Sequence, residues 1–281
     1  MTRLETAIAT RDEIATLIEW AAGEGWNPGL GDIEPFMAAD PEGFHVGRLA
    51  GEMVSGVSVT RTGAGFAFLG FYLCAPAHRG QGHGMAVRNA GLAHAGGATI
   101  GLDGVVAQQE NYRRSGFALA HRNVRYGGRV TIDDADAAGI VAIDAGLLAG
   151  VIDFDAAHYG VARPAFLRQW LNGGDGRQAR ALIGADGIRG YGVIRPCRDG
   201  HKIGPLFAED EASAEALFRA LARQAGGGMV YLDPPQPNAA ATRLAERHGL
   251  APVFETARMY RGPAPDLPLG RIFGITTFEL G

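Results

Sequence analysis

An internal repeat constrains the fold more than any other feature of this chain. Residues at matching places recur 134 positions further on, as the pairs Gly56 and Gly190, Val59 and Val193, Arg61 and Arg195, and Leu69-Gly70 and Ile203-Gly204. Two further matches have an offset of 133, namely Gly116-Phe117 with Gly249-Leu250, and Arg125 with Arg258. Chance agreement among the 43 glycines would not keep its register through several separate segments. The repeat therefore predicts two copies of one fold.

Length and composition fit two globular copies. The 281 residues are 47% hydrophobic and 20% charged, which is enough apolar material for two packed cores. We expect one domain at residues 1–130 and a second at residues 131–281, joined around residues 129–149. This junction is marked as solvated by three acidic residues, Asp133, Asp134 and Asp136.

Helix and strand patterns alternate along the first copy. Thr10 can cap a helix that carries four apolar residues on one face, Ile14, Leu17, Ile18 and Ala21. Phe44–Leu49 and Val54–Thr60 have the pattern of a hairpin. Phe66–Cys74 is almost wholly apolar, as in a strand that is buried on both faces. This order predicts an α/β fold, in the form of an α+β mixed sheet with helices between its strands.

Charge and composition exclude several classes of function. The net charge is −4 and the basic residues are scattered, so we expect no nucleic-acid partner and no anionic membrane partner. Only Cys74 and Cys197 are present, each alone in an apolar run, which suits a reducing cytoplasm. No apolar window is long enough to span a membrane, and the eight histidines are dispersed. We therefore expect a cytoplasmic protein without a metal site.

A glycine-rich turn at residues 73–85 connects the buried strand to the next helix. Gly80, Gly82 and Gly84 let the backbone turn sharply and leave its amides open to a ligand. Free N–H groups and the helix dipole at such a turn favour an anion, here a pyrophosphate. A turn without a ligand is the alternative interpretation.

The spacing of the glycines shows which kind of phosphate-binding loop this segment resembles. A dinucleotide-binding loop has GxGxxG, with an acidic residue about 20 positions later, where only Asp103 comes near. A P-loop needs GxxxxGK[ST], which this segment lacks. The spacing Arg79-x-x-Gly82-x-Gly84 instead resembles [QR]xxGx[GA], the acyl-CoA signature of the GNAT acetyltransferases.

This resemblance implies acetyl-CoA as cosubstrate. It assigns the binding of acetyl-CoA to Leu73, Cys74, Arg79, Gly80, Gln81, Gly82, His83, Gly84, Met85 and Asn111. Residues 111–117 are similar to the late Tyr-x-x-x-Gly-Phe element of the family, whose tyrosine often protonates the departing thiolate. The match gives that catalytic role to Tyr112. A tyrosine packed at a helix end is the alternative.

The resemblance extends over nearly the whole chain. Trp26-Asn27-Pro28, residues 40–44 and residues 271–274 look like bacterial two-domain GNAT proteins, so we expect tandem GNAT folds. The second copy has Glu209-Asp210-Glu211 where the first has its glycine loop, and Ala245 in place of Tyr112. Acidic side chains at a helix N-terminus would cap it and repel a pyrophosphate. The second copy is therefore expected to have lost the cofactor site and to contribute substrate pocket, stability or an assembly surface.

The acceptor side is less well marked in the sequence. The loop with Trp26 and Asn27 is expected to form the acceptor wall, although Trp26 could equally be a core anchor. Three residues are candidates for the base, Asp32, Asp103 and His45. Asp155 and Arg163 resemble recurrent positions of the two-domain proteins and could form an interdomain ion pair or contact substrate.

The sequence thus predicts an N-acetyltransferase that moves an acetyl group to an amine of a small molecule or peptide. It would act by direct attack on the thioester. The chain could pair as a homodimer. Three alternatives stay open at this point. They are a non-catalytic acyl-CoA sensor or assembly module, an aminoacyl-tRNA-dependent transferase on a tandem GNAT fold, and a tandem enzyme like mycothiol synthase.

Overall fold

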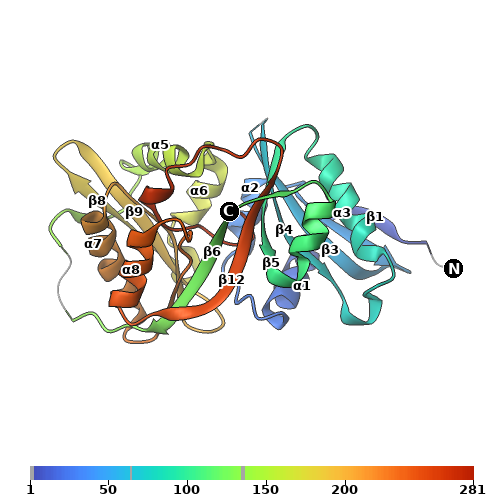
Figure 1. Cartoon of the computed structure of the whole chain (residues 1–281), viewed down its shortest axis with the longest axis horizontal. Coiled ribbons are helices and arrows are strands. Elements are labelled where there is room, and N and C mark those ends of the chain that lie inside the picture. The colour runs from blue at the N-terminus through green and yellow to red at the C-terminus, as the bar shows by residue number, and fades with distance from the viewer. Residues whose placement is uncertain (1–2, 64, 134–136) are drawn as a thin grey trace.

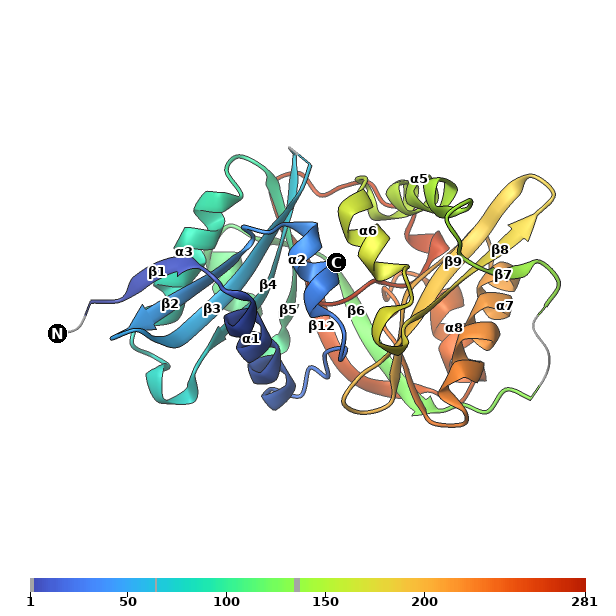
Figure 2. The same cartoon turned by 180° about the vertical axis from the view of Figure 1, so that it is seen from behind.

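A single mixed sheet runs through the length of the molecule (Figures 1 and 2). The computed structural model describes residues 3–63, 65–133 and 137–281, so Asp134 and Asp136 of the predicted junction lie outside the described residues. The strand order is β1-β2-β3-β4-β5-β12-β6-β11-β10-β9-β8-β7, and β13 pairs with β10. The strands are β1 Glu5–Ile8, β2 Phe44–Leu49, β3 Glu52–Thr62, β4 Phe66–Cys74, β5 Thr99–Val105, β6 Ala118–Arg129, β7 Ile140–Ala142, β8 Gln178–Gly184, β9 Gly187–Pro196, β10 His201–Ala208, β11 Met229–Leu232, β12 Ala251–Arg261 and β13 Ile272–Gly274.

Helices cover both faces of this sheet (Figures 1 and 2). They are α1 Arg11–Gly23, α2 Ile33–Ala39, α3 His83–His94, α4 Gln109–Arg114, α5 Leu148–Tyr159, α6 Pro164–Trp170, α7 Glu211–Ala222 and α8 Ala239–Arg247. One continuous apolar core joins α1 and α2 of the first copy to α5 and α6 of the second. Separate cores lie under α3 in the first copy and under α7 and α8 in the second. The mixed α/β fold expected from the sequence is confirmed.

The helix, hairpin and strand predicted from local sequence patterns in the first copy are present in the structure. Thr10 caps α1 through a reciprocal capping box with Glu13, and the four predicted apolar residues of this helix are buried. The hairpin of β2 and β3 forms, and β4 has the bounds predicted for the buried strand. In the part of the chain that the structure describes, no helix is long and apolar enough to cross a membrane.

The two copies exchange their last strands. β12 of the second copy pairs with β5 of the first, and β6 of the first copy pairs with β11 of the second. β6 and β12 also pair with each other, so they cross the middle of the molecule side by side (Figure 1). The predicted boundary between residues 130 and 131 stays a prediction, because this exchange makes the sheet continuous across it.

Two buried ion pairs fix the exchange. Arg258 of β12 donates to both oxygens of Asp103 on β5, at 2.9 and 2.8 Å. Arg125 of β6 donates to both oxygens of Asp233, which follows β11, at 2.7 and 2.8 Å. Each arginine thus pairs with an aspartate of the other copy, and the repeated arginines noticed in the sequence have matching structural roles.

The C-terminal segment explains another repeated pair. A Cβ at Gly204 would collide with the backbone carbonyl of Thr276, and a Cβ at Gly70 would collide with the carbonyl of Glu279. Both glycines therefore admit the C-terminal segment directly against the strands β10 and β4. The chain ends at the centre of the molecule, between its two halves (Figures 1 and 2).

Candidate functional site

The N-terminus of α3 forms an uncapped, glycine-lined turn. Gly80 and Gly82 have φ values of 74° and 85°, which side chains other than glycine rarely adopt. Gly82 is the N-cap residue and offers no side chain to the first turn of the helix. Nothing lies within 4 Å of a Cβ added at Gly80 or Gly82, so the turn has open space beside both glycines. This is the geometry of an anion site at a helix N-terminus.

The matching turn of the second copy is capped. Asp210 accepts a hydrogen bond from the backbone N–H of Ser213 at 2.8 Å and so closes the N-terminus of α7. Glu211 pairs with Arg243 at 3.0 Å and with Arg247 at 3.2 Å. The expected acidic cap is confirmed, and its negative charge opposes the binding of a second anion.

The other residues assigned to acetyl-CoA surround the α3 turn. Arg79 pairs with Glu24 of the α1 end and donates to the carbonyl of Cys74 at 3.0 Å. Gln81 donates to the carbonyl of Ala77 at 3.0 Å. The remaining ones lie on the β4 end, on the first turn of α3 and on α4, namely Leu73, His83, Gly84, Met85 and Asn111. Except for Asn111, which binds Gln108 at 2.8 Å, they all lie within residues 73–85.

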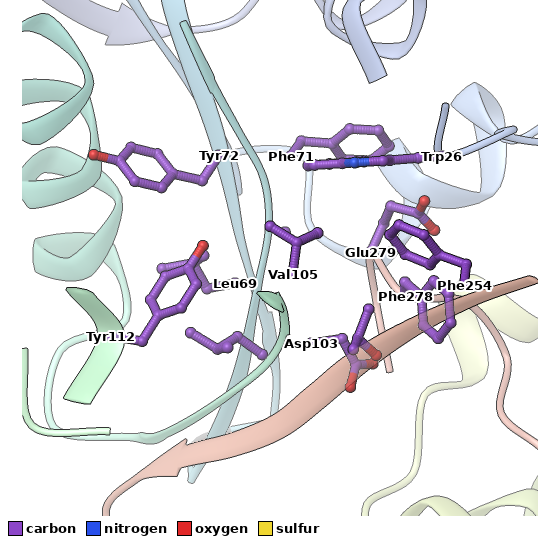
Figure 3. Close-up of a pocket in the computed structure, with 13 residues that line it drawn as sticks. Trp26, Leu69, Phe71, Tyr72, Asp103, Val105, Tyr112, Phe254, Phe278 and Glu279 are labelled. Atoms are coloured by element: carbon purple, nitrogen blue, oxygen red, sulfur yellow. The ribbon is translucent and has the colours of Figure 1, made fainter. Parts of the chain in front are cut away.

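A pocket opens where β4 and β5 separate. The two strands pair in parallel from Phe66 with Thr99 to Leu69 with Leu102, and then diverge. The diverging ends and neighbouring segments line the pocket, with Tyr72 and Tyr112 at one end (Figure 3). At the other end lie the aromatic and acidic side chains of Trp26, Phe254, Phe278 and Glu279 (Figure 3). The pocket therefore connects the α3 side of the sheet with the side covered by α1 and the C-terminal segment.

Phe71 holds a strained backbone at the point of divergence. Its φ is 46°, in the left-handed region that an aromatic residue rarely adopts. The register of β3 and β4 shifts here, so that Phe71 and Tyr72 together oppose Val57 as a β-bulge. Such strain costs on the order of 1–3 kcal/mol and concentrates at functional sites.

Tyr112 lies on α4 against the diverging strand β5. Gly104 makes room for its ring, since a Cβ there would lie 2.9 Å from Tyr112 Cδ2. The ring also packs edge-to-face against Phe117, with a centroid distance of 6.0 Å. Burial raises the pKa of the Tyr112 hydroxyl well above its usual value, so the group stays protonated and can donate.

Of the predicted acceptor residues, some line the pocket and others contact neighbouring segments outside it. Trp26 lines the pocket, whereas Asn27 exchanges hydrogen bonds with the backbone of Asp199 at 2.9 and 3.1 Å. Asp32 is buried, binds the Gly29 amide at 3.0 Å and pairs with Arg195 at 3.1 Å. Neither Asn27 nor Asp32 is among the residues that line this pocket.

The other two candidate bases also have partners or lie elsewhere. Asp103 lines the pocket, but Arg258 and Asn123 together occupy both of its oxygens. Burial raises the pKa of Asp103, and these two partners oppose that shift. His45 lies on β2, outside the pocket lining, and burial lowers its pKa. Of the predicted set, the structure thus brings Trp26, Asp103 and Tyr112 together at one pocket.

Glu279 of the C-terminal segment is a pocket residue that is not among those predicted from the sequence. This side chain lines the pocket, is 2% exposed, and has a buried oxygen, Oε1, without a hydrogen-bond partner among the described residues. A signal was present, because Glu279 is the only charged residue between Ile272 and Leu280.

Asp155 and Arg163 form a buried ion pair within the second copy. Arg163 donates to both Asp155 oxygens at 2.9 and 2.8 Å, and to Thr276 Oγ1 at 2.7 Å. The pair joins α5 to the start of α6 and helps to hold the C-terminal segment, so it is not interdomain. Across residues 3–63, 65–133 and 137–281, no group of three or more His, Cys, Asp or Glu side chains could hold a metal ion.

Comparison with known proteins places this geometry among acyltransferases. A family profile described as "Acetyltransferase (GNAT) domain" matches residues 151–274, in the half with the capped turn. A curated relative, holothin acyltransferase from Pseudoalteromonas sp. (strain SANK 73390), is 36% identical over 276 residues. The match covers 97% of this chain and 93% of that relative.

Solved structures share the fold of both halves. A putative acetyltransferase from Pyrococcus horikoshii has a TM-score of 0.83 at 22% identity, and the match covers 99% of this chain and 96% of that one. A tandem GNAT protein from the clavulanic acid biosynthesis pathway has a TM-score of 0.59 at 15% identity, with 93% and 100% covered. The second likeness agrees with two copies of the fold in one chain.

Proposed function

Because this chain belongs to the GNAT superfamily of acyltransferases, we propose that it transfers an acetyl group from acetyl-CoA to an amine. The acceptor would be a small molecule or a peptide, and the amine would attack the thioester directly. The observation that carries the proposal is the uncapped, glycine-lined N-terminus of α3 beside the β4–β5 pocket. An anion site and a reaction pocket on the same strand are what an acyl-CoA donor requires.

Different residues along the pocket would bind the donor and transfer protons. The amides of the α3 turn would bind the pyrophosphate, and Tyr112 would donate a proton to the departing sulfur. An alkylamine with a pKa of about 10.4 needs about 4.6 kcal/mol to lose its proton at pH 7, against about 2 kcal/mol of mismatch for a thiol near 8.5. Removing the amine proton is therefore the larger task, and it falls to the end of the pocket opposite Tyr112.

The named substrate of the relative supplies a first acceptor to test. The related protein is called holothin acyltransferase, so holothin belongs in an acceptor panel for this chain, with benzylamine, tyramine and a dipeptide. Thiol release from acetyl-CoA would report turnover, and mass spectrometry would identify the acetylated amine. Thiol release without an acylated product from any acceptor would contradict the proposal.

Acetyl-CoA should bind once per chain. The first copy has the uncapped turn, whereas the second has Asp210 over the same helix end and β13 paired along its diverging strand β10. Calorimetric titration should give a stoichiometry near one. Two equivalent sites would show that the second copy has kept its cofactor site.

Replacing Gly82 with valine should raise the KM for acetyl-CoA roughly tenfold or more, because valine resists a positive φ and fills the space before the α3 amides. Gly96 provides a matched control at the other end of the same helix. It has a φ of 61° and open space around it, so Gly96→Val brings similar strain without touching the turn. Equal KM values for both variants and the wild type would refute the anion site.

A further inference from the structure

The C-terminal segment carries a carboxylate into the reaction pocket. Thr277 Oγ1 accepts hydrogen bonds from the backbone N–H groups of Glu279, at 3.1 Å, and Leu280, at 2.9 Å, which fixes the last turn of the chain. The backbone of Glu279 lies directly on Gly70 of β4, where a side chain would not fit. Glu279 is therefore held beside the point at which β4 and β5 diverge.

Two cations near this end of the pocket, Arg125 of the first copy and Lys202 of the second, do not pair with Glu279. Arg125 is engaged by Asp233 and donates to the Trp26 carbonyl at 2.8 Å, and Lys202 donates to the same carbonyl at 3.0 Å. No ion pair within 4.0 Å joins Glu279 to another described residue. Its Oε1 is consequently a buried acceptor that the fold leaves unsatisfied.

An unsatisfied buried carboxylate is unfavourable unless something else binds it. Leaving a charged acceptor without a partner destabilises a fold by more than a neutral one would. The charge of Glu279 acts on the neighbouring Lys202. Burial and Arg125 lower the pKa of Lys202 to about 8, and Glu279 opposes that shift. A cationic group that enters the pocket would supply the missing partner.

Building on the proposed function, we propose that Glu279 binds the acceptor amine and takes its proton during acyl transfer. The walls beside it are the aromatic rings of Trp26, Phe254 and Phe278 (Figure 3). The substrate class that fits is a small primary amine with an apolar body, bound on the side of the sheet opposite α3. The carboxylate thus comes from the second copy, and the active site of the first copy is incomplete without it.

The proton balance of the step assigns complementary roles to the two ends of the pocket. The neutral amine attacks the thioester carbonyl carbon, the C–N bond forms, and the nitrogen gives one proton to Glu279. The C–S bond then breaks, and the leaving thiolate accepts a proton from Tyr112. Water returns the proton from Glu279 to Tyr112, so an amide and free CoA thiol are formed from amine and thioester. An acceptor that arrives as an ammonium ion first gives an additional proton to Glu279, which passes it to solvent before the attack.

The Glu279→Gln variant tests this role because it keeps the shape of the side chain and removes the base. We expect kcat to fall about 10²–10⁴-fold with acetyl-CoA and the best acceptor of the panel, while the Kd for acetyl-CoA changes less than about threefold. Asp266→Asn is the matched control, because it removes an exposed carboxylate from the same C-terminal segment. It should leave kcat unchanged.

A second variant separates base chemistry from packing. Glu279→Ala should be partly restored by added formate, which can enter the vacated space and accept the proton, whereas a packing role would give no rescue. Glu279→Gln turnover within about threefold of wild type, or loss of activity together with acetyl-CoA affinity and no formate rescue, would overturn the proposal. A wild-type protein that acylates no amine would instead overturn the proposed function, and this inference with it.

Discussion

Replacing Tyr112 with phenylalanine should lower kcat for acyl transfer about a hundredfold and leave the KM for acetyl-CoA nearly unchanged. The ring and its contacts with Gly104 and Phe117 are kept, so the fold should be intact. The expected loss lies at the low end for a general acid because a thiol with a pKa of about 8.5 is a good leaving group. The deficit should therefore shrink above that pH, where the thiolate departs without a proton. Steady-state kinetics between pH 7 and 9.5 would measure it.

Tyr72 supplies the control for this experiment. It lies at the same end of the pocket, and burial raises its pKa as well, but its hydroxyl faces Gly84 of α3, whose Cβ would lie 3.1 Å away. Tyr72→Phe should consequently affect acetyl-CoA binding more than kcat. A Tyr112→Phe enzyme with wild-type turnover, or equal losses of kcat for the two variants, would reduce Tyr112 to a packing residue.

Local sequence signals were sufficient for the elements and for the glycine turn. Thr10 and Glu13 form a capping box whatever the distant chain does, and the apolar run of β4 can be buried only as a central strand. Gly80 and Gly82 were expected to serve a sharp turn, and their positive φ values agree. These features depend on residues that are close in sequence, which is why they could be predicted.

The strand exchange could not be predicted from the same patterns. Alternation and apolarity show which face of a strand is buried, but they do not identify the neighbouring strand. β6 could have paired with β5 of its own copy, as its place in the chain suggests. The informative residues were Arg125 and Arg258, since a repeated arginine on a buried strand needs a buried carboxylate. The partners, Asp233 and Asp103, became identifiable only once the copies were placed together.

The base assignment required knowledge of the path of the C-terminal segment. Asp103 is one of three candidate bases that the sequence offers, but in the structure it is bound by Arg258 and Asn123. Glu279 is more than 160 residues from Tyr112 in sequence, yet it lines the same pocket. A role of Asn27 and Asp32 in acceptor binding remains a prediction. Their contacts in the structure hold the Trp26 loop in place.

Removing one partner of an exchanged ion pair should strongly destabilise the whole chain. Arg258→Met should lower the free energy of unfolding by about 3–5 kcal/mol, because Asp103 would be left buried without its cation. Arg122 of β6 and Glu255 of β12 form an exposed pair on the other side of β12, with side chains that are 48% and 39% exposed. Arg122→Met should therefore change stability by less than about 1 kcal/mol. Denaturant titration of both variants would measure the difference.

The pH dependence of the Arg258→Met variant identifies the cause of its instability. Burial already raises the pKa of Asp103, and without Arg258 it should rise further above its unfolded value of about 3.9. A carboxyl whose pKa is raised in the folded state favours folding below its unfolded pKa, and this contribution is lost as the pH rises through the folded pKa. The stability gap to wild type should thus be largest near pH 7 and should narrow toward pH 4. The Asp103→Asn, Arg258→Met double variant should recover part of the loss at pH 7, since no charge remains to be buried. A gap that is independent of pH would show that Arg258 stabilises the sheet through its packing over Phe68 instead.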